Sequence, residues 1–234
     1  MKVYLVRHGR STGNLPGRMT GWSDHSLTDV GVEQATRVAA RLAPLGAMPI
    51  LSSDLPRALE TARLIARRWP EGERLITADE RLREIGLGEY EGRSWDEFTR
   101  DAALAARFDA DPFTTALPGG ESLGMVSERA VAAFDDALAA AGASPSQAAV
   151  VVAHDSPIRA IVNHALLVPP ERHWTLTTSH GGLSLLEMSD GWVSVHFVND
   201  TSHLRGLDRS REAEAVDEAP TRAIERASEG EAGD

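Results

Sequence analysis

The sequence predicts an α/β fold, a three-layer α/β/α sandwich around a mainly parallel sheet with at least one antiparallel strand. Short apolar runs alternate with amphipathic segments of helical period, which is typical of a sheet covered by helices on both faces. Near the end, Ser189-Asp190-Gly191 separates two apolar runs, as in a hairpin of antiparallel strands. Residues 79–126 interrupt the alternation, and we expect them to form a largely helical, lid-like insertion.

The first half of the chain is expected to fold as strand, helix, strand, helix, strand. It opens on an apolar, β-branched run, Lys2 to Val6, which stops at Arg7-His8-Gly9. The segments expected next are a loop over Leu15–Leu27, a helix capped by Thr28 with Val32, Ala35, Val38, Ala39 and Leu42 on its apolar face, a strand over Ile50–Ser52, a helix from Pro56 to about Trp69, and a strand over Arg74–Ala78.

The second half begins where the insertion ends, in the turn Pro118-Gly119-Gly120. The segments expected next are a helix capped by Ser127 with Val131, Phe134 and Leu138 on one face, the buried strand Ala148–Ala153, a helix over Pro157–Leu167, and the hairpin strands Leu183–Met188 and Trp192–Val198. We therefore expect one domain over residues 1–205. Residues 206–234 are acidic and poor in apolar side chains, which predicts a flexible tail or a lone solvated helix.

Composition narrows the classes of function. The chain has 234 residues, 42% of them hydrophobic and 25% charged, as in ordinary soluble globular proteins. A formal net charge of −11 disfavours nucleic acid as a partner but permits a small phosphorylated substrate, because a few arginines can dominate one pocket. The absence of cysteine excludes disulfides and thiolate catalysis. With no membrane-length apolar segment and no basic-then-apolar leader, we expect a cytoplasmic protein with no membrane partner, and a homodimer stays open.

Reactive side chains follow three of the predicted strands. Arg7 and His8 end the first, Arg57 comes soon after the second, and His154 follows the buried strand. Ligands of such sheets bind outside the carboxyl ends of the strands, so these residues are expected to converge. Arginine matches phosphate geometry, and a neutral imidazole is a competent nucleophile. The eight histidines show no metal-ligand spacing, and neither a metal nor a cofactor is expected.

Six segments in order carry a family resemblance: LVRHGRSTGN, SSDLPRALETA, LREIGLGEYEG, PGGES, VVVAHDSPIRA and NDTSHL. Together they resemble the successive motifs of the histidine phosphatase (phosphoglycerate mutase-like) superfamily, and the last is similar to the closing strand of its phosphatase members. The resemblance spans residues 1 to 205. It implies a metal-free reaction in which a histidine attacks a phosphoryl group and becomes a phosphohistidine.

The resemblance also implies roles for individual residues. These are His8 as nucleophile, Arg7, Arg57 and His154 as phosphate-binding groups, Asn14 as an uncharged hydrogen-bond donor, and Glu84 as proton donor to the leaving oxygen. Glu84 would later activate the water that cleaves the phosphohistidine. Because Glu80, Glu89 and Glu91 lie nearby, the choice of Glu84 rests on its Arg-Glu-Ile context.

Two residues depart from the family pattern. Asp155 stands where the family usually has glycine after the second histidine, and its carboxylate would lie near the phosphate dianion. Thr20 stands where related phosphatases often carry glutamine in the pocket loop. Of the other histidines, His180, which precedes Gly181-Gly182, is the one that could reach the pocket. We count Asp155, Thr20 and His180 with Asn14 as candidate substrate-binding residues.

Besides a phosphoglycerate-type mutase, three functions are compatible with these features, and the favoured one is a phosphomonoesterase that hydrolyses a small phosphorylated metabolite. A phosphoglycerate-type mutase is disfavoured because residues 90–126 offer only Arg93, Arg100 and Arg107, with no lysine or arginine pair to retain a bisphosphorylated intermediate. A repurposed enzyme could instead use Asp155 for isomerisation, transfer or elimination on an anionic substrate. The third is a binding module without turnover. The aromatic residues of the insertion, Trp95, Phe98, Phe108 and Phe113, favour a leaving group with some hydrophobic surface.

Overall fold

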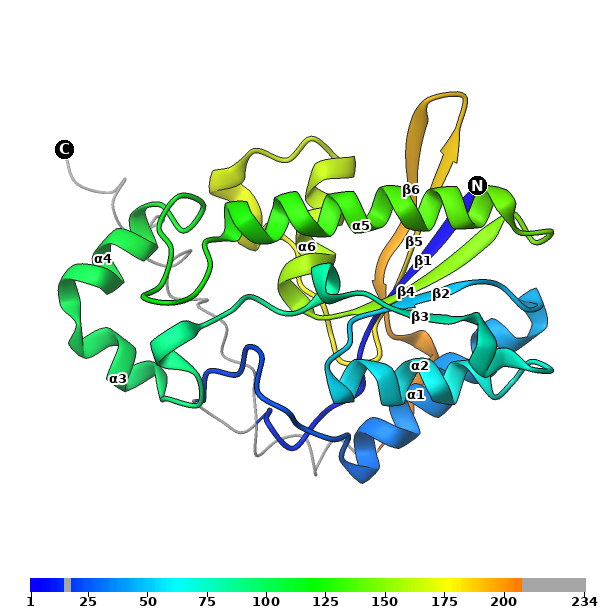
Figure 1. The fold of residues 1–234 in the computed structure, drawn as a ribbon, viewed down its shortest axis with the longest axis horizontal. Coiled ribbons are helices and arrows are strands. Elements are labelled where there is room, and N and C mark those ends of the chain that lie inside the picture. The colour runs from blue at the N-terminus through cyan, green and yellow to red at the C-terminus, as the bar shows by residue number, and fades with distance from the viewer. Residues whose placement is uncertain (15–17, 208–234) are drawn as a thin grey trace.

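A six-stranded mixed sheet forms the centre of the protein, and Figure 1 shows it edge-on between helices. The computed structural model describes residues 1–14 and 18–207. In spatial order the strands are β3 (Ile76–Ala78), β2 (Ile50–Ser52), β4 (Ala148–Ala153), β1 (Lys2–Arg7), β5 (Leu183–Ser189) and β6 (Trp192–Asp200). β3, β2, β4 and β1 are parallel, whereas β5 and β6 run antiparallel to their neighbours. The predicted fold class is confirmed.

Helices cover both faces of this sheet. α1 (Asp29–Leu42) and α2 (Pro56–Ala66) pack on one face, and α5 (Leu123–Ala143) and α6 (Asp155–Ala165) pack on the other (Figure 1). Strand β1 shows why two cores form, because successive side chains of a strand point to opposite faces. Its Tyr4 and Val6 join the core under α1 and α2, while Val3 and Leu5 join the core under α5 and α6.

The insertion lies at one end of the sandwich and has a small core of its own. It contains two short helices, α3 (Trp95–Arg100) and α4 (Ala102–Ala110), at the left of Figure 1. Its core side chains are Met19, Leu87, Tyr90, Phe98 and Leu117, with Ile85, Trp95, Leu104, Ala105 and Phe108 packed against them. Phe113 lies apart from this cluster, with its ring 6.2 Å from that of His173.

One expectation about the start of α5, one about the buried face of α1 and one about the end of α2 were wrong. Helix α5 begins at Leu123, because the Ser122 hydroxyl, and not that of Ser127, accepts the capping hydrogen bond from Met125 N. Val32 is exposed, since the buried face of α1 passes through Gly31 and Ala35. Trp69 is buried but lies in the turn after α2.

The boundaries of three other elements also differ from the prediction. Strand β3 is short because Gly72–Leu75 forms a 3₁₀ turn before it. Helix α6 starts two residues before the expected Pro157, directly after His154, and strand β6 continues to Asp200.

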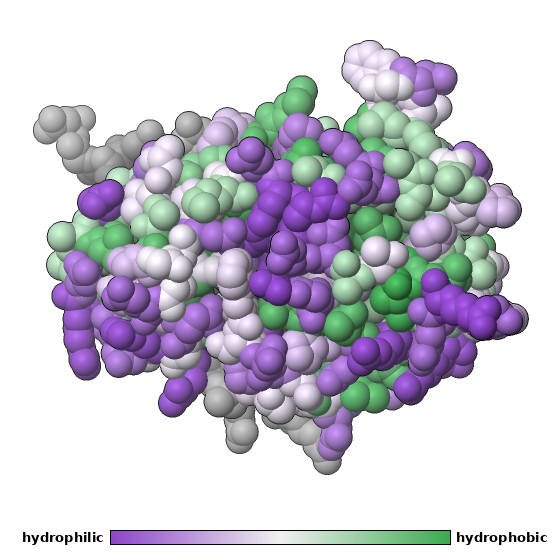
Figure 2. Space-filling model, viewed as in Figure 1, coloured by the Kyte–Doolittle hydropathy of each residue, from purple (hydrophilic) through white to green (hydrophobic). Residues whose placement is uncertain are grey.

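Some expectations fall outside the described residues. These are Leu15–Gly17 of the first loop and residues 208–234 of the predicted tail. Within residues 1–14 and 18–207, no helix has the length and apolar character needed to cross a membrane. Figure 2 shows hydrophilic and hydrophobic side chains interspersed on one face of the molecule, with a hydrophilic stretch across the middle of the view.

The position of Leu5 under α5 and α6 predicts a large stability effect. Leu5 has no exposed surface, whereas Leu167 is 87% exposed. Leu5→Ala should lower the free energy of unfolding by about 2–5 kcal/mol, because it leaves a cavity in a packed core. The matched substitution Leu167→Ala should change it by less than about 0.5 kcal/mol. Equal losses in chemical denaturation would contradict the assignment of this core.

Candidate active site

The carboxyl ends of three neighbouring strands bring the candidate residues together. Arg7 of β1 is in register with Ala153 of β4, so the residues that follow them, His8 and His154, lie side by side. The His8 N–H donates to the Ala153 carbonyl at 3.0 Å, and the two imidazole centroids are 4.8 Å apart. Ser53 follows β2 and completes this edge. The predicted convergence at the strand ends is therefore present.

The ring of His8 is held in one tautomer. His8 Nδ1 lies 2.7 Å from the Gly9 carbonyl oxygen, which can only accept, so Nδ1 carries the proton and Nε2 keeps its lone pair. Burial lowers the pKa of the His8 imidazole well below its ordinary value, and the positive charges of Arg57 and Arg7 lower it further. The arrangement supplies a neutral imidazole with a free nucleophilic nitrogen.

Glycine at position 9 permits the turn that provides this acceptor. A Cβ on Gly9 would lie 2.2 Å from the Gly31 carbonyl oxygen, at the start of α1. The loop after β1 therefore packs directly on the backbone of α1, and the Gly9 N–H donates to the Thr61 hydroxyl at 3.1 Å. These contacts fix the position of the carbonyl that orients His8.

Arg57 and His154 form a buried chain beside His8. Arg57, in the first turn of α2, donates from its two terminal nitrogens to the Ser23 carbonyl at 2.9 Å and the Gly21 carbonyl at 2.7 Å. Its Nε donates to His154 Nδ1 at 3.3 Å, and His154 Nε2 lies 2.9 Å from the Ser53 hydroxyl. Burial, with the charge of Arg57, lowers the pKa of His154 well below its ordinary value. A neutral His154 thus accepts from Arg57 and helps to hold it.

Glu84 lies at the N-terminus of α6. Its carboxylate accepts hydrogen bonds from the N–H groups of Ile85 at 2.9 Å, Asp155 at 3.1 Å and Ser156 at 3.2 Å. The last two begin α6, where free N–H groups and the helix dipole favour a negative charge. A rigid backbone framework therefore orients the carboxylate.

Among the four neighbouring glutamates, only Glu84 lines the cavity described below. Glu80 and Glu89 are exposed. The carboxylate of Glu91 accepts from Gly21 N and Trp22 N, and from the Ser23 hydroxyl. Glu91 thus ties down the loop whose carbonyls hold Arg57.

Asp155 is paired with cations. Its Oδ2 accepts from Arg159 Nε at 2.8 Å, and its Oδ1 accepts from the Thr178 hydroxyl and lies 3.8 Å from Arg7 Nη1. Arg7 Nη1 also donates to the Thr178 carbonyl at 2.7 Å. Sequence reasoning missed Arg159, although its place four residues after Asp155 on one helix predicts such a pair. The carboxylate balances two arginines at the rim of the site.

The remaining predicted residues differ in their access to the cavity. Asn14 lines the cavity, and its side-chain oxygen accepts from Ser11 N and the Ser11 hydroxyl. The Thr20 hydroxyl donates to the Gly13 carbonyl at 2.8 Å, and Thr20 also lines the cavity.

His180 and His154 are not among the cavity-lining residues. The His180 ring lies 5.3 Å from that of His8, and its buried Nε2 has no hydrogen-bond partner among the described residues. Burial, with the charges of Arg7 and Arg10, lowers the pKa of His180 well below its ordinary value. Both rings pack around His8, which shields its imidazole from solvent.

The cavity at this edge has a volume of about 340 Å³ and two kinds of wall. Charged and polar side chains, among them Arg7, His8, Arg57 and Glu84, form one side. The small core of the insertion supplies apolar lining, from Met19, Ile85, Leu87, Trp95, Phe98, Phe108 and Leu117. Trp174 and Arg18 also line the cavity. The cavity can therefore hold a small anion against His8 and an apolar group against the insertion.

Comparison with known proteins agrees with this arrangement. A probable phosphoglycerate mutase GpmB of Yersinia pestis is 33% identical over 212 residues, which cover 87% of this chain and 95% of that protein. The solved structure of Bacillus stearothermophilus YhfR superposes with a TM-score of 0.77 and 30% identity, covering 87% of this chain and 98% of that one. The structure of a mycobacterial glucosyl-3-phosphoglycerate phosphatase, solved with inorganic phosphate, superposes with a TM-score of 0.74 and 26% identity. The match covers 86% of this chain and 98% of that one.

The match to a family sequence model extends over residues 3–201 and so includes every segment that contributes to the cavity. The fold, the strand-end histidines and this match lead to one conclusion. The chain belongs to the histidine phosphatase superfamily (branch 1).

Proposed function

We propose that this protein is a phosphomonoesterase that hydrolyses a small phosphorylated metabolite through a phosphohistidine on His8. The observation that carries the proposal is the neutral His8 imidazole, whose unprotonated Nε2 shares one cavity with Arg7, Arg57 and Glu84. Phosphoryl transfer requires a nucleophile placed in line and cations around the three equatorial oxygens, and this cavity supplies both from side chains.

In the first step, His8 Nε2 attacks phosphorus and the bond between phosphorus and the leaving oxygen breaks. Arg7 and Arg57 neutralise the charge on the equatorial oxygens, and the amide of Asn14 donates a further hydrogen bond. A bound phosphate dianion disfavours a second negative charge beside it, so in the complex Glu84 carries a proton despite its helix N-terminus. Glu84 transfers this proton to the leaving oxygen, and the product departs as a neutral alcohol. His154 acts in this step by holding Arg57, to which it is hydrogen-bonded at 3.3 Å.

In the second step, water attacks the phosphohistidine. Glu84, now a carboxylate, accepts a proton from that water, the nitrogen–phosphorus bond breaks and inorganic phosphate leaves. His8 returns to its starting tautomer, because the Gly9 carbonyl retains the Nδ1 proton throughout. One carboxylate therefore serves as acid and then as base, as microscopic reversibility requires.

Two observations favour hydrolysis over the alternatives. None of the cavity-lining residues within the described segment 90–126 is charged, so the insertion itself offers no cation to retain a bisphosphorylated intermediate, although one relative is named a probable mutase. A cation beside it, Arg18, comes from the loop after β1 and donates to the Gly92 carbonyl at 3.0 Å. Asp155, which a repurposed enzyme would use, has its oxygens occupied by Arg159, Thr178 and Arg7. We propose that Asp155 supports substrate binding by holding Arg7.

Replacing the nucleophile tests the proposal. Phosphate release from a panel of phosphomonoesters should be measurable for the wild type. It should fall by about 1,000-fold or more in His8→Ala, because covalent catalysis is lost. His164→Ala, at an exposed histidine of α6, is the matched control and should retain activity. No release from any ester by the wild type would overturn the proposal.

The need for a neutral His8 predicts a pH dependence of stability. Its pKa is lowered in the folded protein, so between the folded and unfolded pKa values the unfolded chain binds more protons. The free energy of unfolding should therefore fall as the pH drops below about 6.5, with each such histidine contributing up to about 1.4 kcal/mol per pH unit. Chemical denaturation at several pH values should show that the free energy of unfolding depends less steeply on pH in His8→Asn than in the wild type. An unchanged slope would contradict a neutral, buried His8.

The apolar wall predicts a preference for a hydrophobic leaving group. Phe108→Ala should lower kcat/KM for 1-naphthyl phosphate about 10-fold relative to glycerol phosphate, because it removes apolar contact with the leaving group only. Phe113→Ala is the matched control, since Phe113 is not among the cavity-lining residues. If both variants shifted the ratio equally, Phe108 would have no specific role in leaving-group recognition.

A further inference from the structure

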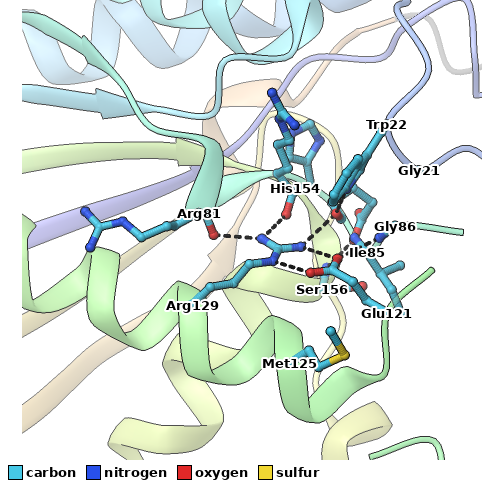
Figure 3. Close-up of polar contacts among 12 residues, drawn as sticks. Gly21, Trp22, Arg81, Ile85, Gly86, Glu121, Met125, Arg129, His154 and Ser156 are labelled. Carbon is cyan, nitrogen blue, oxygen red and sulfur yellow. Dashed lines mark hydrogen bonds and ion pairs between the residues drawn. The ribbon is translucent and has the colours of Figure 1, made fainter. Parts of the chain in front are cut away.

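Arg129 is a partly buried arginine outside the cavity, and all the donors of its guanidinium group are engaged in hydrogen bonds. From α5, its Nε and Nη2 each donate to a carboxylate oxygen of Glu121 at 2.8 Å, in a bidentate pair. Its Nη1 donates to the carbonyls of Arg81 at 2.7 Å and Arg83 at 2.6 Å, and its Nη2 also donates to the Glu84 carbonyl at 2.8 Å. All five N–H groups of the side chain are used. Figure 3 shows Arg129 reaching from the helix between Arg81 and Glu121.

Glu121, which belongs to the PGGES segment, holds the same loop from its other side. Its Oε2 accepts from Gly86 N at 2.8 Å, and its own N–H donates to the Gly86 carbonyl at 2.8 Å. Glycine at 120 permits this approach, because a Cβ there would lie 2.3 Å from that carbonyl oxygen. Trp22 Nε1 adds a second donor to the Glu84 carbonyl, at 2.7 Å.

These contacts bind the backbone on both sides of Glu84. The Arg129–Glu121 pair binds the carbonyls of residues 81, 83 and 84 and both backbone polar groups of Gly86. The Glu84 carboxylate accepts from the first N–H groups of α6. Neither Arg129 nor Glu121 lines the cavity, so neither touches a bound substrate. Their effect on the reaction must pass through Glu84.

We propose that Arg129 and Glu121 are positioning residues that place the Glu84 carboxyl group for proton transfer to the leaving oxygen. This inference rests on the proposed function, since it assigns a support to the proposed acid. A positioned acid matters most when the leaving oxygen is strongly basic, and little when the leaving group departs readily as an anion. Leaving-group dependence therefore separates a positioning role from a general contribution to folding.

The experiment compares 4-nitrophenyl phosphate, which has a good leaving group, with phenyl phosphate and an alkyl phosphate. Arg129→Lys keeps the charge but cannot make five hydrogen bonds in a planar fork, and Glu121→Gln keeps the size but loses the ion pair. For phenyl and alkyl phosphate, kcat/KM should fall about 10- to 100-fold in both variants, as for a misplaced catalytic group. For 4-nitrophenyl phosphate it should fall less than about 3-fold, and the same pattern should appear in Glu84→Gln.

Arg81→Lys is the matched control. Its side chain pairs with Asp79 and Asp136 at the surface and not with Glu121, so the leaving-group dependence should stay that of the wild type. Combining Arg129→Lys with Glu84→Gln gives a second readout. If Arg129 acts only by placing the acid, the combination should lose no more than Glu84→Gln alone, because no acid is left to place.

Two results overturn the inference while the proposed function stands. One is an equal loss for all esters in both Arg129→Lys and Glu121→Gln, and the other is a loss by Arg129→Lys that adds in full to that of Glu84→Gln. If the wild type hydrolyses no phosphomonoester, the proposed function is overturned and the positioning role with it. The wild-type panel thus distinguishes the two failures.

Discussion

The hydrogen bond between His8 Nδ1 and the Gly9 carbonyl is the constraint on which the site depends. It places the ring proton on Nδ1 and leaves Nε2 free, so the imidazole faces the cavity as a nucleophile. The bond exists because β1 ends at Arg7 and the chain then turns tightly against α1, where only glycine fits at position 9. Burial keeps the ring neutral by lowering the pKa of His8. Strand end, turn and tautomer therefore form one causal chain.

The charged side chains around His8 are contributed by several elements of the fold. The arginines and carboxylates of the site come from the carboxyl end of β1, the first turn of α2, the loop before α3, and α6. Arg57 is held by carbonyls and by the neutral His154, and Glu84 by backbone N–H groups. Neutral partners restrain a charged group without cancelling its charge, so Arg57 and Glu84 stay available to a substrate. Arg7 is held differently, by the Thr178 carbonyl and by the Asp155 carboxylate.

Sequence reasoning located the strand-end residues because the ends of strands and the alternation of strands with helices follow from local patterns. The Arg-His-Gly ending of β1 and the apolar run before His154 are visible in a single chain. The supports are not, because they join distant segments: Arg159 meets the chain near Thr178, and Arg129 meets carbonyls more than 40 residues away. The start of α5 was misplaced for a related reason, since Ser122 and Ser127 are equally good caps by type and only packing distinguishes them.

The central claim concerns one atom, His8 Nε2, and mapping the phosphoryl group on the trapped enzyme tests it most directly. The protein would be quenched during turnover of a phosphomonoester, digested under alkaline conditions, and the phosphorylated residue and ring nitrogen identified by mass spectrometry and phosphorus NMR. We predict Nε2-phosphohistidine at His8 alone. A phosphoryl group on Nδ1, which the Gly9 carbonyl blocks, or on a different residue would contradict the account.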